Sequence, residues 1–307
     1  VVVLAGMGGW GKALLADYVH RPEIFSRLTG ISLGDKIHAE QIVKILRSHQ
    51  GGLKGIPDGT QKTVFLNQAD NDLLQSKAAS IAEQLIDVYD QVLIGSLQKP
   101  GTGGAIFSVH TRTAGIILAA GGSDRLGQPK QLLRWQGEPY VRKVAQTALA
   151  AGLSPVYVIT GAEHEAVEDV LSDLPVKLQY NPAWQSGQSS TMKSGLEALP
   201  NDCDSALFLL SDQPQVSEHL IRQLVERYAQ HRKPITAPLA GDRRGNPVLF
   251  NQRTFRALQE VSGDKGGRAI LSQFEVDWLP WVDERINRDV DLPGDEEDLL
   301  AAYFPQA

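Results

Sequence analysis

The sequence contains very little cysteine, no long apolar run and no excess of positive charge. Cys203 is the only cysteine among the 307 residues, which excludes a framework of internal disulfides and fits a reducing compartment. No stretch approaches the roughly 20 apolar residues of a membrane span, so no membrane association and a cytoplasmic location are predicted. Because 30 basic residues stand against 36 acidic ones, without a basic stripe, nucleic acid is not expected as a partner.

Several catalytic patterns are also missing. The chain has no Ser-His-Asp order, no H-E-x-x-H and no pair of cysteines, which leaves hydrolase and zinc-enzyme readings without support. What the chain does have is an alternation of apolar, β-branched runs with amphipathic helical stretches, such as "TVFLNQ", a helix over about 73–89, and "QVLIGSL". This alternation predicts an α/β fold with mainly parallel strands.

The chain length indicates about two domains. A cluster of proline and glycine at residues 100–104 is the best candidate for a linker. We therefore expect a first domain with linker over residues 1–109 and a second domain over residues 110–307. Since Val1 already lies in an apparent strand, the chain is also expected to be the remainder of a longer one.

The first lines of the sequence raise the possibility of a phosphate loop. In "VVVLAGMGGWGKALL" an apolar run enters a glycine-rich turn that ends at Lys12, close to the G-x-x-x-x-G-K-[ST] pattern. Ala13 stands where that pattern needs a hydroxyl to ligate magnesium. A degenerate loop and an ordinary turn after a strand are the two interpretations, and the turn is preferred.

A second short element in this half is "NQAD" at residues 67–70, which is similar to the N-K-x-D base-recognition element of GTPase-like folds. A polar turn after a parallel strand is the equal alternative. Together with "VHRPEIFSRLTG" and "GGLKGIPDG", these residues resemble the C-terminal part of the YqeC-like accessory family of selenium-dependent hydroxylases. The resemblance implies a partial P-loop-like α/β domain that hydrolyses nothing by itself.

A glycine loop in the second half carries the stronger signal. The strand in "AGIILAAGGSDRLGQPKQLL" leads into small residues whose bare backbone N–H groups let a polyphosphate approach, and Arg125 and Lys130 follow on the same loop. Two cations beside an amide cradle suit a ligand with several negative charges. A glycine-rich turn with two solvated cations is the alternative.

Asp212 ends another apolar strand, "ALFLLSD", at the edge where ligands of open α/β sheets bind. There its carboxylate is a candidate ligand for Mg²⁺, a hard cation that bridges to substrate phosphates. Capping of the next helix is the alternative role, but Ser217 is the better N-cap because Glu218 and a helical pattern follow it directly.

These motifs, with "NPAWQSGQSSTMKSGL", "GNPVLF" and "GDKGGRAIL", resemble the MobA-like nucleotidyltransferases over residues 113–307, and most closely the molybdenum cofactor cytidylyltransferases. The resemblance implies a three-layer Rossmann-like domain that transfers CMP from CTP to molybdopterin in the presence of Mg²⁺. A molybdenum hydroxylase apoenzyme is a possible recipient of the product. The pair Ala119-Ala120 is similar to the cytidine-using branch, whose guanosine-using relatives carry a second glycine there.

The resemblance also implies the roles of individual residues. Arg125, Lys130 and Asp212 are expected to be catalytic, and Ser190 is also a candidate cap for the helix that it enters. The departure of "NRDVDLPGDEEDLL" from the family's D-x-D-T-P-x-D-L ending leaves a solvated acidic turn as the alternative to a metal-binding pair. The expected nucleotide site contains Leu118, Ala119, Ala120, Gly121, Gly122, Ser123 and Gly161, the acceptor site Ser189, Ser190, Lys193, Asp264, Lys265 and Arg268, and the metal site Asp212, Asp289 and Asp291.

Three alternatives remain open at this point. The nucleotide can be GTP in place of CTP, or the acceptor can be a sugar phosphate or an isoprenoid precursor. The third alternative is a non-catalytic accessory protein that binds a molybdenum or selenium hydroxylase. Retention of Arg125, Lys130 and Asp212 together argues against a silent scaffold.

Overall fold

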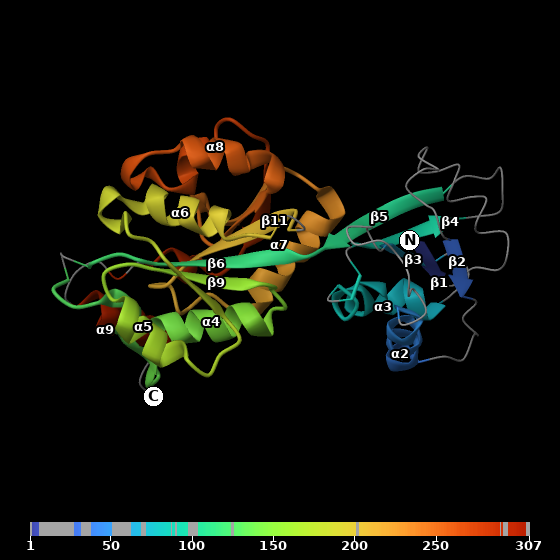
Figure 1. The fold of residues 1–307 in the computed structure, drawn as a ribbon, viewed down its shortest axis with the longest axis horizontal. Coiled ribbons are helices and arrows are strands. Elements are labelled where there is room, and N and C mark those ends of the chain that lie inside the picture. The colour runs from blue at the N-terminus through green and yellow to red at the C-terminus, as the bar shows by residue number, and fades with distance from the viewer. Residues whose placement is uncertain are drawn as a thin grey trace. The chain divides into compact units, whose positions relative to one another are not determined.

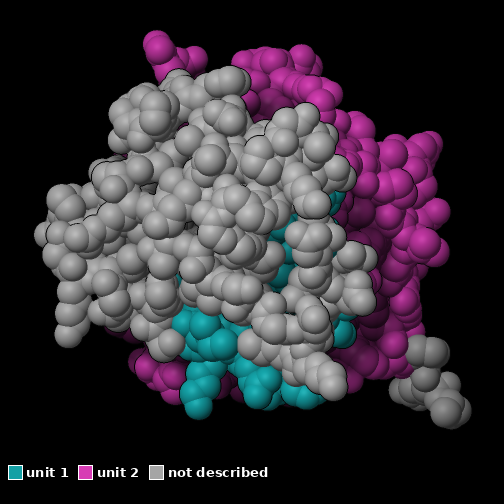
Figure 2. Space-filling model, turned by 90° about the vertical axis from the view of Figure 1, so that its right-hand side faces the viewer, with its two compact units in different colours: residues 1–112 teal, residues 113–307 magenta. Residues whose placement is uncertain are grey.

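The computed structural model of the chain contains two compact units, Val1–Arg112 and Thr113–Ala307 (Figure 1). Figure 2 colours unit 1 teal and unit 2 magenta. Each unit has its own sheet and its own core, so each is described by itself. The structure describes residues 2–5, 28–31, 38–50, 63–68, 72–86, 88–89, 91–97, 104–123, 126–200, 203–288, 290 and 294–304.

Unit 1 is built on a five-stranded sheet. Three of its four strand pairs are parallel, and the pair β4–β5 is antiparallel. In sheet order, the strands are β2 (Leu28–Ile31), β1 (Val2–Ala5), β3 (Thr63–Asn67), β4 (Gln91–Leu97) and β5 (Gly104–Thr111).

Two described helices, α2 (Ala39–Gln50) and α3 (Asp72–Glu83), pack their apolar sides into one core with β3 and β4. The predicted strands β3 and β4 are confirmed, whereas the helix predicted to reach Tyr89 ends at Glu83. The chain turns there because it must enter β4, and the buried Tyr89 hydroxyl donates to the Leu46 carbonyl at 2.8 Å. Residues 6–13, 69–70 and 98–103, which carry the candidate phosphate loop, part of "NQAD" and most of the candidate linker, lie outside the described residues.

Unit 2 contains an eight-stranded sheet whose centre is parallel. β6 pairs in parallel with β9 and β11, while β14 joins β11 in antiparallel orientation. This confirms the predicted α/β class with a mainly parallel central sheet. In sheet order, the strands are β10 (Lys177–Tyr180), β9 (Val156–Thr160), β6 (Thr113–Ala119), β11 (Ser205–Leu210), β14 (Val248–Asn251), β12 (Ile235–Ala240) and β13 (Arg243–Arg244), with β15 (Val276–Trp281) paired to β12.

Helices cover both faces of this sheet and give three layers (Figure 1). Ile116 and Ile117 are neighbours in β6 but lie in different cores, because successive strand residues point to opposite faces. Among the described helices, none is both long and apolar enough to cross a membrane. The helices are α4 (Tyr140–Ala150), α5 (His164–Leu171) and α7 (Glu218–His231) on one core, α6 (Gln188–Glu197) and α8 (Phe255–Glu260) on the other, and α9 (Asp295–Tyr303) against the hairpin β7 (Arg134–Trp135) and β8 (Glu138–Pro139).

The beginnings of two helices test the predicted caps. Ser217 is the N-cap of α7, and its Oγ accepts a hydrogen bond from the Leu220 N–H at 3.2 Å, as predicted. The prediction that Ser190 caps α6 is wrong, because the N-cap is Gly187, whose φ of +102° favours glycine. Ser190 instead lies in the first turn, with its hydroxyl 2.9 Å from the carbonyl oxygens of Ala183 and Gly187.

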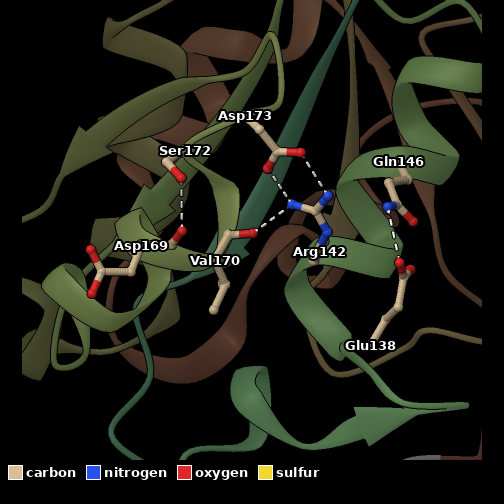
Figure 3. A network of polar contacts seen from close by, with 7 residues as sticks. All are labelled: Glu138, Arg142, Gln146, Asp169, Val170, Ser172 and Asp173. Atoms are coloured by element: carbon tan, nitrogen blue, oxygen red, sulfur yellow. Dashed lines mark hydrogen bonds and ion pairs between the residues drawn. The ribbon is translucent and has the colours of Figure 1, made fainter.

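A polar network joins α4 to the end of α5 (Figure 3). The Arg142 guanidinium donates to both carboxylate oxygens of Asp173, at 2.5 and 2.8 Å, and to the Val170 carbonyl at 2.9 Å. Because two parallel hydrogen bonds fix the planar groups against each other, this pair has a defined geometry at the surface. It holds the pKa of Asp173 at about 2, chiefly through the hydrogen bonds from Arg142.

Candidate active site

A cavity of about 780 Å³ opens where β6 and β11 end. Because these strands are parallel neighbours, their carboxyl ends lie at one edge of the sheet, where the Ser211 N–H donates to the Leu118 carbonyl at 3.2 Å. The cavity is lined there by residues 120–123 from the loop after β6, by Leu210 at the end of β11 and by residues 211–212 that follow it. We call it the first cavity.

The loop after β6 is held in shape by its own side chains. Ser123 has a φ of +57°, and its Oγ accepts a hydrogen bond from the Lys130 N–H at 3.0 Å. The Gln131 side chain, only 2% exposed, donates from Nε2 to the Gly121 carbonyl at 3.2 Å. These contacts tie Gly121 and Ser123 to Lys130 and Gln131, and Gly121 and Gly122 line the cavity.

Opposite charges meet in the first cavity. The Lys130 ammonium lies 3.9 Å from the Asp212 carboxylate, and both side chains are partly exposed. A negatively charged ligand and a cation entering together would each find an oppositely charged group already in place. The neighbouring Tyr140 is buried, and its pKa is raised by burial and, to a smaller extent, by the carboxylates of Glu296 and Asp212.

The far wall of the first cavity comes from the beginning of α6. Gln188 and Thr191 line it, together with Trp184 from the preceding turn. Asp264 also lines it, and its Oδ1 accepts a hydrogen bond from the Gln188 N–H at 3.3 Å. The carboxylate of Asp264 therefore already occupies the position that an anion would take at this helix N-terminus.

A second cavity of about 350 Å³ shares Leu118, Gln188 and Leu210 with the first. The apolar residues of its lining are Met192, Phe208, Val248, Phe250 and Leu271, of which Met192, Phe208 and Phe250 are buried. Its cationic side chains come from two separate segments, as Arg244 lies on β13 and Lys265 and Arg268 lie in the loop after α8.

The structure brings together most of the expected nucleotide site. Leu118, Ala120, Gly121, Gly122 and Ser123 all line the first cavity. Ala119 does not, because strand alternation turns its methyl group into the core. Gly161 is not a lining residue either, but it packs directly behind the loop, where an added Cβ would lie 2.5 Å from the Ala120 carbonyl oxygen.

Of the other expected site residues, some line one of the two cavities, some line neither, and some lie outside the described residues. Lys130 and Asp212 line the first cavity, whereas Arg125, Asp289 and Asp291 lie outside the described residues. In the expected acceptor site, Asp264 lines the first cavity, and Lys265 and Arg268 line the second. Ser189, Ser190 and Lys193 are not among the residues that line either cavity.

Several lining residues were missed from the sequence. Gln188, Thr191 and Met192 face the cavities, whereas the predicted Ser189 and Ser190 point elsewhere on α6. A helix start placed at Gln188 would have put residues at i, i+3 and i+4 on one face and identified them. Gln131 had no such signal, because its contact with Gly121 depends on how the loop folds back.

The donor set of the first cavity fits a magnesium ion. Mg²⁺ is commonly held by one or two carboxylates together with substrate phosphates and water. Asp212 supplies one such carboxylate in the first cavity. Among the described residues, no group of three or more His, Cys, Asp or Glu side chains is arranged to hold a metal without a substrate.

Comparison with known proteins agrees with this geometry. The family model described as "MobA-like NTP transferase domain" matches residues 115–278, which is more than half of the chain. The purine catabolism protein PucB of Bacillus subtilis is 29% identical over 171 residues, covering 53% of this chain and 82% of PucB. A "Probable molybdenum cofactor guanylyltransferase" of Bacillus cereus is 26% identical over 186 residues, covering 58% of this chain and 89% of the relative.

Solved structures are similar in fold to the second unit of this chain. Rv0371c from Mycobacterium tuberculosis aligns with a TM-score of 0.57 and 26% identity, covering 62% of this chain and 98% of that chain. A complex of the same M. tuberculosis protein with manganese aligns with a TM-score of 0.56 and 23% identity, covering 62% of this chain and 100% of that chain. These alignments support a Rossmann-like nucleotidyltransferase fold for the matching part of the chain.

Proposed function

We propose that this chain, which belongs to the MobA-like NTP transferase family, transfers CMP from CTP to the terminal phosphate of molybdopterin and releases pyrophosphate. The observation that carries the proposal is the first cavity. It gathers the bare glycine loop, Lys130 and Asp212 at the carboxyl edge of the sheet. This is the set of groups that activation of a nucleoside triphosphate requires.

In the proposed reaction, an oxygen of the acceptor phosphate attacks the α-phosphorus and forms the new P–O bond. The bond between the α-phosphorus and the bridging oxygen breaks, and pyrophosphate leaves with the electron pair. In this proposal, the backbone N–H groups of residues 121–123, which line the first cavity, would hold the β- and γ-phosphates, and Lys130 would neutralise charge at the α-phosphate. No side chain acts as a nucleophile, so catalysis is positioning and charge stabilisation.

The remaining roles in this proposal follow from the family resemblance. Arg125 would join the triphosphate contacts, and Asp289 and Asp291 would complete the ligands of Mg²⁺ beside Asp212. When bound, Mg²⁺ would neutralise phosphate charge in the first cavity. The cytoplasmic location predicted from the sequence belongs to the same proposal.

The choice of cytosine depends on Ala120. Its side chain lines the first cavity but is only 2% exposed, and it lies against Gly161 at the end of β9. Support for cytosine comes from the resemblance, because guanosine-using relatives carry a second glycine at the Ala119-Ala120 pair.

Transfer of GMP from GTP is the second candidate, because the B. cereus relative is described as a guanylyltransferase. Incubation of the full chain with molybdopterin, Mg²⁺ and either CTP or GTP, followed by pyrophosphate release, separates the two. We expect faster release with CTP, and a gain of GTP turnover in Ala120→Gly. Preference for GTP in the unaltered chain would overturn the base assignment alone, and failure with both nucleotides in folded protein would overturn the transferase proposal.

Two further alternatives are tested in the same assay. Sugar phosphates or isoprenoid phosphates that replace molybdopterin would identify a different acceptor. Nucleotide binding without any turnover would favour a non-catalytic accessory protein. For unit 1 we propose a YqeC-like accessory domain with a molybdenum hydroxylase apoenzyme as its partner, to be tested by copurification of that enzyme with the full chain.

A further inference from the structure

We propose that Gln131 is a positioning residue of the glycine loop after β6. By holding the Gly121 carbonyl, it turns the Gly122 N–H toward the first cavity, where the β- and γ-phosphates of a nucleoside triphosphate are proposed to lie. The proposal rests on the proposed function, because it concerns the triphosphate site of that reaction. It adds a residue that was not among the expected site residues, and one that acts through the loop and not on the reacting atoms.

The glycine loop offers backbone donors that the protein itself does not use. In the described parts of unit 2, no group accepts a hydrogen bond from the backbone N–H of Gly121, Gly122 or Ser123. All three residues line the first cavity, and none of them is buried. Successive N–H groups form an anion site only where the peptide planes turn them toward the same space. The orientation of these planes therefore needs a cause in the fold.

Each N–H of the loop is coupled to the carbonyl before it. In a planar trans peptide the C=O and N–H bonds point in opposite directions, so a donor that holds the carbonyl on one side directs the N–H to the other. The Ala120 carbonyl accepts a hydrogen bond from the Ala162 N–H at 3.3 Å, which orients the peptide that contains the Gly121 N–H. The Gly121 carbonyl accepts from Gln131 Nε2 at 3.2 Å, which orients the peptide that contains the Gly122 N–H. Backbone thus sets the first of these planes, and one side chain sets the second.

The burial of Gln131 favours this role over direct contact with a ligand. The residue is almost entirely buried, so its amide presents little surface to the first cavity. Both ends of the amide are used within the loop, since Nε2 donates to Gly121 and Oε1 lies 3.5 Å from the Ser123 hydroxyl that donates to it. A buried amide with partners at both ends holds a defined shape.

The turn that carries Gln131 also carries Lys130. Both lie in the short helical segment Lys130–Leu132, and the Lys130 N–H donates to the Ser123 Oγ at 3.0 Å. Two neighbouring residues of one turn therefore hold the loop, and one of them is the cation 3.9 Å from Asp212. Donors that are oriented before the ligand arrives stabilise charge without a cost of reorganisation.

The test replaces the amide by a neutral side chain that cannot donate. Gln131→Met removes the hydrogen bond to Gly121 and keeps an unbranched side chain in the buried position. Gln131→Leu also lacks a donor and repeats the measurement, so that the result does not depend on how one substitution packs. Gln146→Met is the matched control, because the Gln146 amide donates to the Glu138 carboxylate at 3.4 Å and lines neither the first nor the second cavity.

Calorimetry on the full chain with Mg²⁺ would measure the Kd for CTP, GTP, CMP and GMP, and thermal unfolding would establish that each variant is folded. We expect the Kd for the preferred triphosphate to rise about tenfold in both Gln131 variants, because one oriented hydrogen bond to a charged phosphate is lost. The Kd for the matching monophosphate should change by less than about twofold, since its β- and γ-phosphates are absent. Gln146→Met should leave both affinities within about twofold of the unaltered chain. With molybdopterin, the Gln131 variants should raise the KM for the nucleotide and leave the KM for the acceptor in place.

Two results would overturn the role of Gln131 and leave the proposed function intact. One is a normal triphosphate affinity in both Gln131 variants. The other is an equal loss of affinity for triphosphate and monophosphate, which is the pattern of a merely structural residue. Failure of the proposed function gives a different result, because the folded, unaltered chain would then bind no nucleoside triphosphate, and the role of Gln131 would fall with it.

Discussion

The first and second cavities of unit 2 differ in how their positive charges are balanced. In the first cavity Lys130 already has the Asp212 carboxylate at 3.9 Å, whereas Arg244, Lys265 and Arg268 in the second have no ion-pair partner among the described residues. A balanced pair suits a site where a cation and a polyphosphate enter together.

The cavities also differ in what their glycines face. An added Cβ at Gly121 would meet nothing within 4 Å, so the backbone of the first cavity is open to a ligand. An added Cβ at Gly266 would collide with Gln188, so that glycine serves the packing of the protein itself. Glycine therefore has two different uses in these loops, binding in one and close packing in the other.

The largest expected effect, a loss of kcat, comes from a substitution in the pair of Lys130 and Asp212. In Asp212→Asn the carboxylate is replaced by a neutral amide of the same shape, which removes the proposed metal ligand and the partner of Lys130. We expect kcat to fall on the order of a hundredfold to a thousandfold, because one preorganised charge is lost from the reacting centre. Pyrophosphate release over a range of Mg²⁺ concentrations would measure it.

Asp242→Asn provides the control for this substitution, because Asp242 is an exposed aspartate in the turn before β13 and lines neither cavity. Its kcat should stay within about twofold of the unaltered protein. An Asp212→Asn variant with normal kcat and a normal Mg²⁺ requirement would show that the pair in the first cavity is structural only.

A smaller effect distinguishes the two uses of glycine around the first cavity. Gly161→Ala should lower the free energy of unfolding by about 1–3 kcal/mol, since the new methyl group would press on the Ala120 carbonyl behind the loop. Gly121→Ala should leave stability unchanged or raise it by up to about 1 kcal/mol, because its Cβ meets no atom of the protein. Urea denaturation measures both.

Nucleotide affinity should respond in the opposite order. Gly121→Ala puts its methyl group where the phosphates are proposed to lie, and we expect the Kd for the nucleotide to rise about tenfold or more. If Gly121→Ala bound nucleotide normally, the loop would not be the phosphate cradle. If Gly161→Ala were as stable as the unaltered chain, the close contact behind the loop would be wrong.

The sequence was sufficient to predict the elements whose signal is local. The alternation of apolar strands and amphipathic helices predicted the α/β class, and Ser217 before Glu218 predicted the start of α7. The cap of α6 was wrong because the chain begins that helix from a glycine with positive φ, which leaves Ser190 inside the first turn. The predicted cap was three residues too late, and Ser189 and Ser190 were expected at the site where Gln188 and Thr191 line the cavity.

The sequence alone could not predict which residues lie together only because of the tertiary fold. Arg244 precedes Lys265 by about twenty residues, and only the packing of the loop after α8 against α6 and β14 brings them to one cavity. Asp264 was grouped with Lys265 because the two are adjacent in the chain. In the folded unit they face different cavities, since the short helical turn at Gly263–Lys265 directs neighbouring side chains apart.

The smallest effect concerns the surface ion pair of Arg142 and Asp173. Because Arg142 holds the pKa of Asp173 at about 2, below its ordinary value of 3.8, the pair stabilises the folded unit above about pH 4, and this contribution is lost as the pH falls toward 2 (Figure 3). Asp173→Asn should therefore lower the Tm slightly at neutral pH, by an amount that shrinks with added salt, and the difference from the unaltered chain should vanish near pH 2. Asp169→Asn, which changes an exposed carboxylate on α5 that has no ion-pair partner in the described part of the chain, should not reproduce this pH dependence. A difference that stays constant from pH 7 to pH 2 would show that Asp173 acts through packing and not through its charge.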